Sequence, residues 1–207
     1  MVCKEDVLTW FKDLECYKRI DVMHDLLNMC LPYEIRFIGT CVEEMGKQNY
    51  QELCGHTSVV NDPEKLAKDG VISPGLLDET ARSRVVLYLS LLSSKNYSSA
   101  NWIFNRFRTE LEECINRGNV KDDSVQSELL LLLTIGLHHP AFTFYHKTNF
   151  ARLVLELIEQ REERKSSTFK PHVRYYPPGL GYPTAQNNSV RLSILCFASP
   201  QNTSQFK

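Results

Sequence analysis

The chain has 207 residues, which is enough for one domain with about forty residues to spare. Hydrophobic residues make up 43% of it and charged residues 24%, as in ordinary globular proteins. All 25 acidic residues precede Ser166, whereas four of the 24 lysines and arginines follow it, so residues 1–165 carry a net charge of −5 and the remainder +4. A negative body is a poor match for a phosphate backbone, which argues against direct nucleic-acid binding.

Two further classes of protein are disfavoured by the hydrophobic pattern. The N-terminus, "MVCKEDVLTWFKDLE", has no apolar run after a basic start, so we expect no secretory signal there. The longest uncharged apolar run extends for nine residues, 129–137. A bilayer span needs about twenty, so we expect no membrane segment.

The seven cysteines stand singly along the chain, without a CxxC pair. Most of them fall inside apolar helical patterns, where a cysteine behaves as a small buried hydrophobe. A disulfide framework or a zinc ribbon would need paired spacing. We therefore expect reduced thiols and an intracellular protein.

In chain order, apolar residues at helical spacing predict helices over residues 5–16, 19–31 and 33–48, and the last should be amphipathic with its polar side in water. Residues 61–70 predict a short helix that begins near Pro63 and ends by Gly70. Longer helices are expected within 73–96, 96–118, 122–139 and 143–165. The stretch 85–92 is apolar on nearly every side, which places its helix in the middle of the bundle.

These patterns predict an all-α fold, a compact bundle or short stack of about eight helices followed by an extended tail. Residues 1–165 form the expected helical protein-interaction domain. Residues 166–207 are rich in Pro, Gly and Asn and contain no acid, so we expect disorder there. The alternative left open is that "RYYPPGLGYP" or the strand-like "VRLSILCF" within this tail binds a partner.

No catalytic, metal or cofactor motif is present. The sequence has no GxSxG elbow, no GxxxxGK[ST] loop and no GxGxxG loop. His138, His139 and His146, with Cys114, lack the close spacing of zinc ligands. We interpret Pro140 instead as the residue that ends the leucine-rich helix, with Phe142 and Phe144 wedged into the corner that follows. We therefore expect no enzyme, no metal and no cofactor.

Three arginines stand out against this apolar background. Arg36 precedes Phe37, while Arg82 and Arg84 lie in a helix that is otherwise very apolar. Each guanidinium must reach solvent, meet a carboxylate or line a binding groove between helices.

Three long stretches carry a family resemblance. "TWFKDLECYKRIDVMHDLLNMCLPYEIRFIGTCVEEMGKQNYQEL", "ETARSRVVLYLSLLSSKN" and "LLLLLTIGLHHPAFTFYHK" resemble, in this order, the N-terminal region of the zinc-knuckle (CCHC) family of post-transcriptional regulators. A looser similarity reaches the N-terminal domain of Smaug-type RNA regulators, through Trp10–Phe11, Arg36–Phe37, Asn61–Asp62 and His139–Pro140–Ala141. Together these cover roughly residues 7–160.

The resemblance implies a non-enzymatic interaction module. Members of the zinc-knuckle family, to which a nematode germline-survival protein is related, are partners of atypical cytoplasmic poly(A) polymerases (terminal nucleotidyltransferases). In Smaug-type proteins the corresponding region supports self-association, so homodimerisation is the alternative expectation. RNA contact in both families rests on a SAM domain or a CCHC knuckle, and no C-x₂-C-x₄-H-x₄-C pattern occurs here. We expect indirect RNA contact and a cytoplasmic location, in ribonucleoprotein granules.

Two groups of residues are the candidates for partner binding. The first is Tyr33, Arg36 and Phe37 on one expected helix, and the second is His139, Phe142 and Phe144 at the corner after the leucine run. Each of these residues can instead belong to the core or the corner, and for Phe37, Phe142 and Phe144 taken singly that reading is favoured. A third reading of the chain, a hydrolase in an unfamiliar helical fold, finds no motif to support it.

Overall fold

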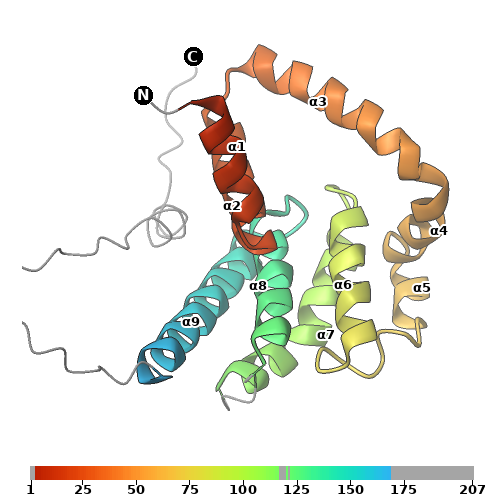
Figure 1. Ribbon diagram of the computed structural model, residues 1–207. Helices are drawn as coiled ribbons and strands as arrows, with labels where there is room; N and C mark the ends of the chain where they lie inside the picture. The colour runs from red at the N-terminus through yellow and green to blue at the C-terminus, as the bar shows by residue number, and fades with distance from the viewer. Residues whose placement is uncertain (1–2, 117–119, 121, 169–207) are drawn as a thin grey trace, which may run out of the picture. The chain divides into compact units, whose positions relative to one another are not determined.

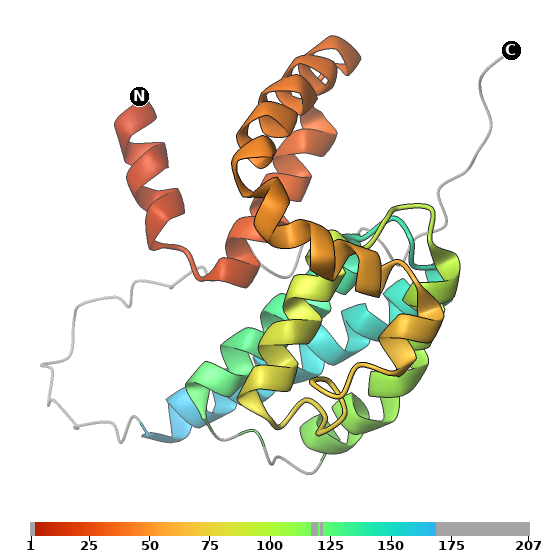
Figure 2. The same cartoon turned by 90° about the vertical axis from the view of Figure 1, so that its right-hand side faces the viewer.

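The structure, a computed structural model, describes residues 3–116, 120 and 122–168, with side chains as far as residue 164. These residues form nine α-helices and one 3-10 turn, and no β-strand occurs among them, which confirms the all-α prediction (Figures 1 and 2). In chain order the elements are α1 (Lys4–Asp13), α2 (Cys16–Met29), α3 (Pro32–Gly46), η1 (Lys47–Asn49), α4 (Tyr50–Val60), α5 (Pro63–Ala67), α6 (Glu79–Leu91), α7 (Tyr97–Asn116), α8 (Asp123–His138) and α9 (Phe144–Thr168).

The chain divides into two units, Met1–Leu157 and Ile158–Lys207. The described part of the second unit is the end of α9, where the Arg164 side chain donates to the Gln160 carbonyl at 3.2 Å. Helix α9 continues to Thr168, three residues beyond the predicted end of the helical domain. The rest of the predicted tail, residues 169–207, lies outside the described residues.

Aspartates begin three of the helices. The Asp62 carboxylate accepts hydrogen bonds from the backbone N–H groups of Glu64 and Lys65 at the start of α5, and Asp78 and Asp122 do the same for α6 and α8. Each carboxylate satisfies a backbone donor that the first helical turn leaves without a partner.

The leucine-rich helix α8 lies at the centre of the first unit. Leu129, Leu130, Leu132 and Leu133 are all almost completely buried. Helices α6, α8 and the first part of α9 lie side by side in both views (Figures 1 and 2). Close packing against α9 depends on Gly136, because a Cβ at that position would come within 2.8 Å of the Phe150 ring.

Arg82 joins the two central helices through a buried ion pair. Its guanidinium, 3% exposed, donates to the Glu128 carboxylate of α8 at 2.5 Å and to the Leu76 and Leu77 carbonyls at 3.0 and 3.3 Å. Of the outcomes predicted for this arginine, the structure selects a carboxylate partner. The same side chain also satisfies the carbonyls of the segment that leads into α6.

The end of α4 is fastened to the segment between α6 and α7 by two asparagines. The Asn61 amide donates to the Leu91 carbonyl at 3.0 Å and accepts from the Ser93 backbone N–H at 2.8 Å. The Asn96 amide donates to the Asn61 carbonyl at 2.8 Å. This network orients α4 beside α6.

Helix α2 packs on α8 through a pair of stacked histidines. The rings of His24 and His138 have centroids 3.9 Å apart, and His138 Nε2 lies 2.9 Å from the Asp21 carboxylate. Burial, and next the neighbouring His138, lowers the pKa of His24, so its neutral form is favoured here.

The cysteine prediction is corrected. Of the six cysteines that the structure describes, Cys114 alone is buried, and Cys3, Cys16, Cys41 and Cys54 are exposed. Cys3, Cys16, Cys30, Cys41 and Cys54 are free thiols, and Cys196 lies outside the described residues. The cysteines of α2 and α3 follow apolar helical patterns, but the apolar faces of these helices are themselves largely exposed.

No helix in the described ranges is long and apolar enough to cross a membrane.

Replacement of Arg82 by methionine tests the buried ion pair. We expect the free energy of unfolding to fall by about 2 kcal/mol, because two carbonyls and Glu128 lose their donor while the one-third exposed glutamate regains some hydration. Urea denaturation followed by circular dichroism measures this change. The same substitution at the exposed Arg36 should alter the midpoint little. Equal effects at the two positions would contradict a structural role for the Arg82–Glu128 pair.

Candidate functional site

The first group of predicted partner-binding residues lies on the exposed surface of α3. Tyr33 is 68% exposed and Phe37 69%, and Arg36 is also exposed. Residues three and four positions apart share one face of a helix, so the three side chains lie near one another. Among the described residues, no carboxylate forms an ion pair with Arg36, which reaches solvent instead. This face joins two large rings to a cation that is available to a partner.

The predicted apolar stripe of α3 is exposed as well. Val42 is 55% exposed and Met45 63%, although the sequence pattern resembles that of a helix packed on a core. Both views show α3 standing apart from α6 and α8 (Figures 1 and 2). Helical periodicity reveals that a helix has an apolar side, but it does not say whether the rest of the chain covers that side.

The large exposed apolar side chains of α1, α2 and α3 are here called the N-terminal apolar surface. Its members are Val7, Leu8, Trp10, Ile20, Met23, Leu26, Met29, Leu31, Tyr33, Ile35, Phe37, Val42 and Met45. Single exposed apolar residues are common, but such a density on three consecutive helices is typical of a surface that contacts another polypeptide.

The second predicted group is divided by the structure. His139 Nε2–H donates to the Leu92 carbonyl at 3.0 Å, and its Nδ1 accepts from the Ala141 backbone N–H at 3.1 Å. Phe142 is buried, with its ring centroid 5.8 Å from that of His139 and 5.1 Å from that of Phe150. The structure therefore brings His139 and Phe142 together inside the fold, where they join the corner to α6.

Phe144 does not take part in this corner. It is the first residue of α9 and is 69% exposed, so the prediction that it wedges into the corner with Phe142 is wrong. The buried ring that packs against Phe142 is Phe150, which lies further along the helix. Phe144 is therefore exposed, as the residues of the first group are, whereas His139 and Phe142 are not.

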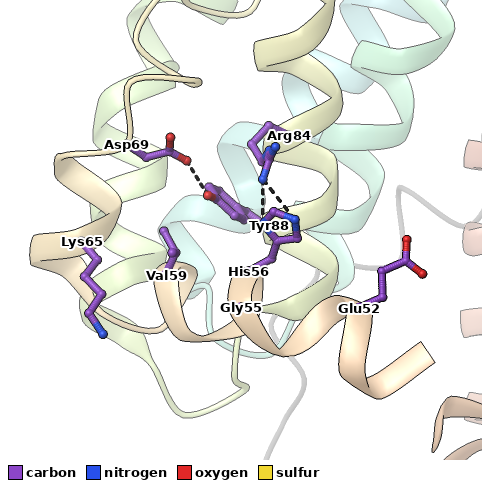
Figure 3. Close-up of a pocket in the computed structure, with 8 residues that line it drawn as sticks. All are labelled: Glu52, Gly55, His56, Val59, Lys65, Asp69, Arg84 and Tyr88. Carbon is purple, nitrogen blue, oxygen red and sulfur yellow. Dashed lines mark hydrogen bonds between the residues drawn. The ribbon is translucent and has the colours of Figure 1, made fainter. Parts of the chain in front are cut away.

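A pocket of about 470 Å³ lies between α4, α5 and α6 (Figure 3). Helix α4 contributes Glu52, Gly55, His56 and Val59 to its lining, α5 and the turn after it contribute Lys65 and Asp69, and α6 contributes Arg84 and Tyr88. Sequence reasoning singled out Arg84 alone, as an unexpected charge in an apolar helix.

A pair of polar side chains meets in this pocket. Arg84 Nη1 lies 2.6 Å from His56 Nδ1 and 3.2 Å from Nε2 (Figure 3). A guanidinium is always a donor, so the ring nitrogen that accepts this hydrogen bond carries no proton.

Tyr88 and Asp69 form a second pair of polar side chains in the pocket. The Tyr88 hydroxyl donates to the Asp69 carboxylate, and the Val71 backbone N–H donates to the other carboxylate oxygen at 2.9 Å. Burial, followed by the hydrogen bond and the negative charge of Asp69, raises the pKa of Tyr88 to about 12. Both carboxylate oxygens of Asp69 are therefore engaged within the fold.

Comparison with known protein families finds two matches that follow one another along the chain. Residues 4–48 match the family model described as RNA-binding protein vts1-like domain. Residues 55–162 match the SMAUG-like PHAT domain. No solved structure matches the chain. Both are RNA-regulatory domains rather than enzyme families.

The two matches divide the candidate surfaces between them. The N-terminal apolar surface lies within the first match, which spans α1, α2 and α3. His139, Phe142, Phe144 and the pocket residues from Gly55 to Tyr88 lie within the second. Glu52, at the edge of the pocket, falls between the matches.

Three histidines are expected to make the stability of the fold depend on pH. Burial lowers the pKa of His24, His139 and His146 below the ordinary value of 6.5. The unfolded chain therefore binds more protons than the folded one near and below that value, and the free energy of unfolding should decrease from about pH 7.5 to about pH 5.5. Urea midpoints across this range measure the decrease.

The substitution His146→Phe gives the matched comparison. The His146 ring stacks on Phe104 with centroids 4.1 Å apart, so phenylalanine keeps the aromatic contact and removes one titrating group. The variant should lose less stability on acidification than the wild type. An unchanged pH slope would show that His146 contributes nothing to it.

Proposed function

Because the chain belongs to the Smaug-like PHAT domain family, we propose that it is a non-enzymatic adaptor that binds an atypical cytoplasmic poly(A) polymerase. Its domains are those of a post-transcriptional regulator. In this proposal the adaptor brings the polymerase to chosen messages and so promotes their polyadenylation, stability and translation. It acts in the cytoplasm, in ribonucleoprotein granules of the germline.

The observation that carries the proposal is the N-terminal apolar surface, on which Tyr33, Arg36 and Phe37 lie exposed on α3. Aromatic and arginine side chains are the residues most often found at the energetic centres of protein interfaces. The choice of a polymerase as the partner rests on the resemblance to the zinc-knuckle family. The same proposal includes a relationship between this chain and the nematode germline-survival protein.

The charge of the domain supports indirect contact with RNA. Residues 1–165 carry a net charge of −5, so long-range attraction to a polyanion is absent. The message is then contacted by the polymerase or by another RNA-binding module.

No group of three or more His, Cys, Asp or Glu side chains placed to hold a metal occurs in the part of the chain that the structure describes.

The test is complex formation between the purified chain and a matching polymerase, followed by size exclusion. The wild-type chain should co-elute with the polymerase. Arg36→Glu should weaken binding about tenfold or more, because the reversed charge opposes a partner selected for a cation. Its melting temperature should barely change, since Arg36 is exposed.

Lys95→Glu is the control for the same charge reversal at an exposed position outside α1–α3. It should bind like the wild type. Failure of the wild-type chain to form a complex would refute the polymerase proposal. A large fall in melting temperature for Arg36→Glu would instead assign that residue a structural role.

The second candidate function is homodimerisation, which the apolar character of the same surface favours. Self-association through one patch on each copy gives a closed, two-fold symmetric contact that hides apolar side chains from water. The two functions are compatible, because a groove at a dimer seam can also receive the polymerase.

Light scattering at tens of micromolar protein tests the dimer. We expect a mass of twice 23.9 kDa for the wild type. The double substitution Met29→Glu and Phe37→Glu, at sites 73% and 69% exposed, should give the monomeric mass with little loss of helix content. A wild-type chain that scatters as a monomer at this concentration would remove the proposal.

A further inference from the structure

The pocket between α4, α5 and α6 holds an arginine that contacts a histidine rather than a carboxylate. Arg82, Arg106, Arg108 and Arg152, by contrast, each lie within 3.7 Å of a glutamate oxygen. Arg84, half-buried, contacts the His56 imidazole and the face of Tyr88, whose ring centroid is 5.9 Å from its Cζ. No carboxylate of the described residues forms an ion pair with it. A half-buried guanidinium without an anion is an incomplete electrostatic arrangement.

The acidic side chains of the pocket do not supply this anion. Both oxygens of Asp69 are occupied by the Tyr88 hydroxyl and the Val71 backbone N–H. Glu52 points away from Arg84 and His56 (Figure 3). Lys65 also points away, toward Ser58 and Asp62 at 3.3 and 3.5 Å.

We infer that this pocket binds the carboxylate of a single aspartate or glutamate side chain from a partner protein, with Arg84 and His56 as its donors. A carboxylate accepts two hydrogen bonds from the planar fork of a guanidinium, and these are stronger than the bond to a neutral ring nitrogen. The ring nitrogen of His56 that does not accept from Arg84 offers a further donor in the same pocket. Val59 provides an apolar wall for the residue beside the acid.

The charges of the lining select a carboxylate over a phosphate or a nucleic acid. Two carboxylates and two cations line the pocket, so its formal charge is zero with His56 neutral. Such a site suits one monoanion and opposes a dianionic phosphate or the run of charges on a strand of RNA. Residues 166–207 contain no Asp or Glu, so this segment does not supply the acid.

Gly55 of α4 lines the pocket. A Cβ at this helical position would meet no atom within 4 Å, so the space beside it is empty. A larger side chain would occupy the pocket without a clash in the fold. Replacement of a glycine inside a helix also stabilises the helix by up to about 1 kcal/mol, so the blocked variant should remain folded.

The experiment titrates the full ¹⁵N-labelled chain with the peptide acetyl-Ala-Leu-Glu-Leu-Ala-amide and follows backbone amide and His56 ring signals by NMR. We expect saturable shifts at Gly55, His56 and Arg84. The matching peptide with glutamine in place of glutamate should bind about tenfold more weakly, because it loses the charge-assisted bonds.

Two variants and one control locate the site. Arg84→Met removes the donor and Gly55→Leu fills the space, so each should weaken glutamate-peptide binding about tenfold or more, while Arg36→Met should leave it unchanged. Circular dichroism verifies that each variant is folded. Two independent variants guard against a loss of binding caused by unfolding, since Gly55→Leu keeps Arg84 and His56.

Several results would overturn the inference. These are the absence of saturable shifts at the pocket, equal affinity for the glutamine peptide, and unchanged binding by both variants. Tighter binding of a third peptide, with phosphoserine in place of glutamate, or of an oligouridine at the same residues would assign the pocket to phosphate or to RNA instead. This site is independent of the polymerase proposal, because Gly55→Leu leaves α3 untouched.

Discussion

Helix α8 imposes the main constraint on this fold, because apolar side chains surround nearly its whole circumference. Such a helix can exist in water only when other helices cover it on every side. Helices α2, α6 and α9 do so, each through a specific contact: the stacked His24 and His138 rings, the Arg82–Glu128 ion pair, and the Phe150 ring over Gly136. The covering by α2 links the Vts1-like segment to the PHAT domain.

The positions of helices could be predicted from the sequence because local signals determine them. Pro63 and Pro140, the capping aspartates and the leucine run each act over a few residues. Burial could not be predicted in the same way. Cys41 and Met45 follow the periodicity of a packed helix, yet α3 has no covering neighbour among the described residues, so both are exposed. Phe144 failed as a corner residue because Phe150, one and a half turns later, occupies that space.

The pocket escaped sequence analysis for a different reason. His56 and Arg84 lie on different helices, 28 residues apart in the chain, and the Asn61 and Asn96 amides set the register that brings them together. Arg84 alone was visible as an anomaly in an apolar helix. The sequence shows that Arg84 is a charge in an apolar helix, but only the tertiary structure shows that its partner is His56.

The exposed thiols of α1 to α4 affect how this protein should be handled. Cys3, Cys16, Cys41 and Cys54 lie on the helices that bear the N-terminal apolar surface or on their flanks. Where two copies contact each other through these helices, oxidation by air can form a disulfide between them. Such a cross-linked dimer would be mistaken for a non-covalent oligomer. Purification in reductant prevents such cross-links, and non-reducing electrophoresis of the final sample shows whether any remain. Together they distinguish non-covalent association from disulfide cross-linking.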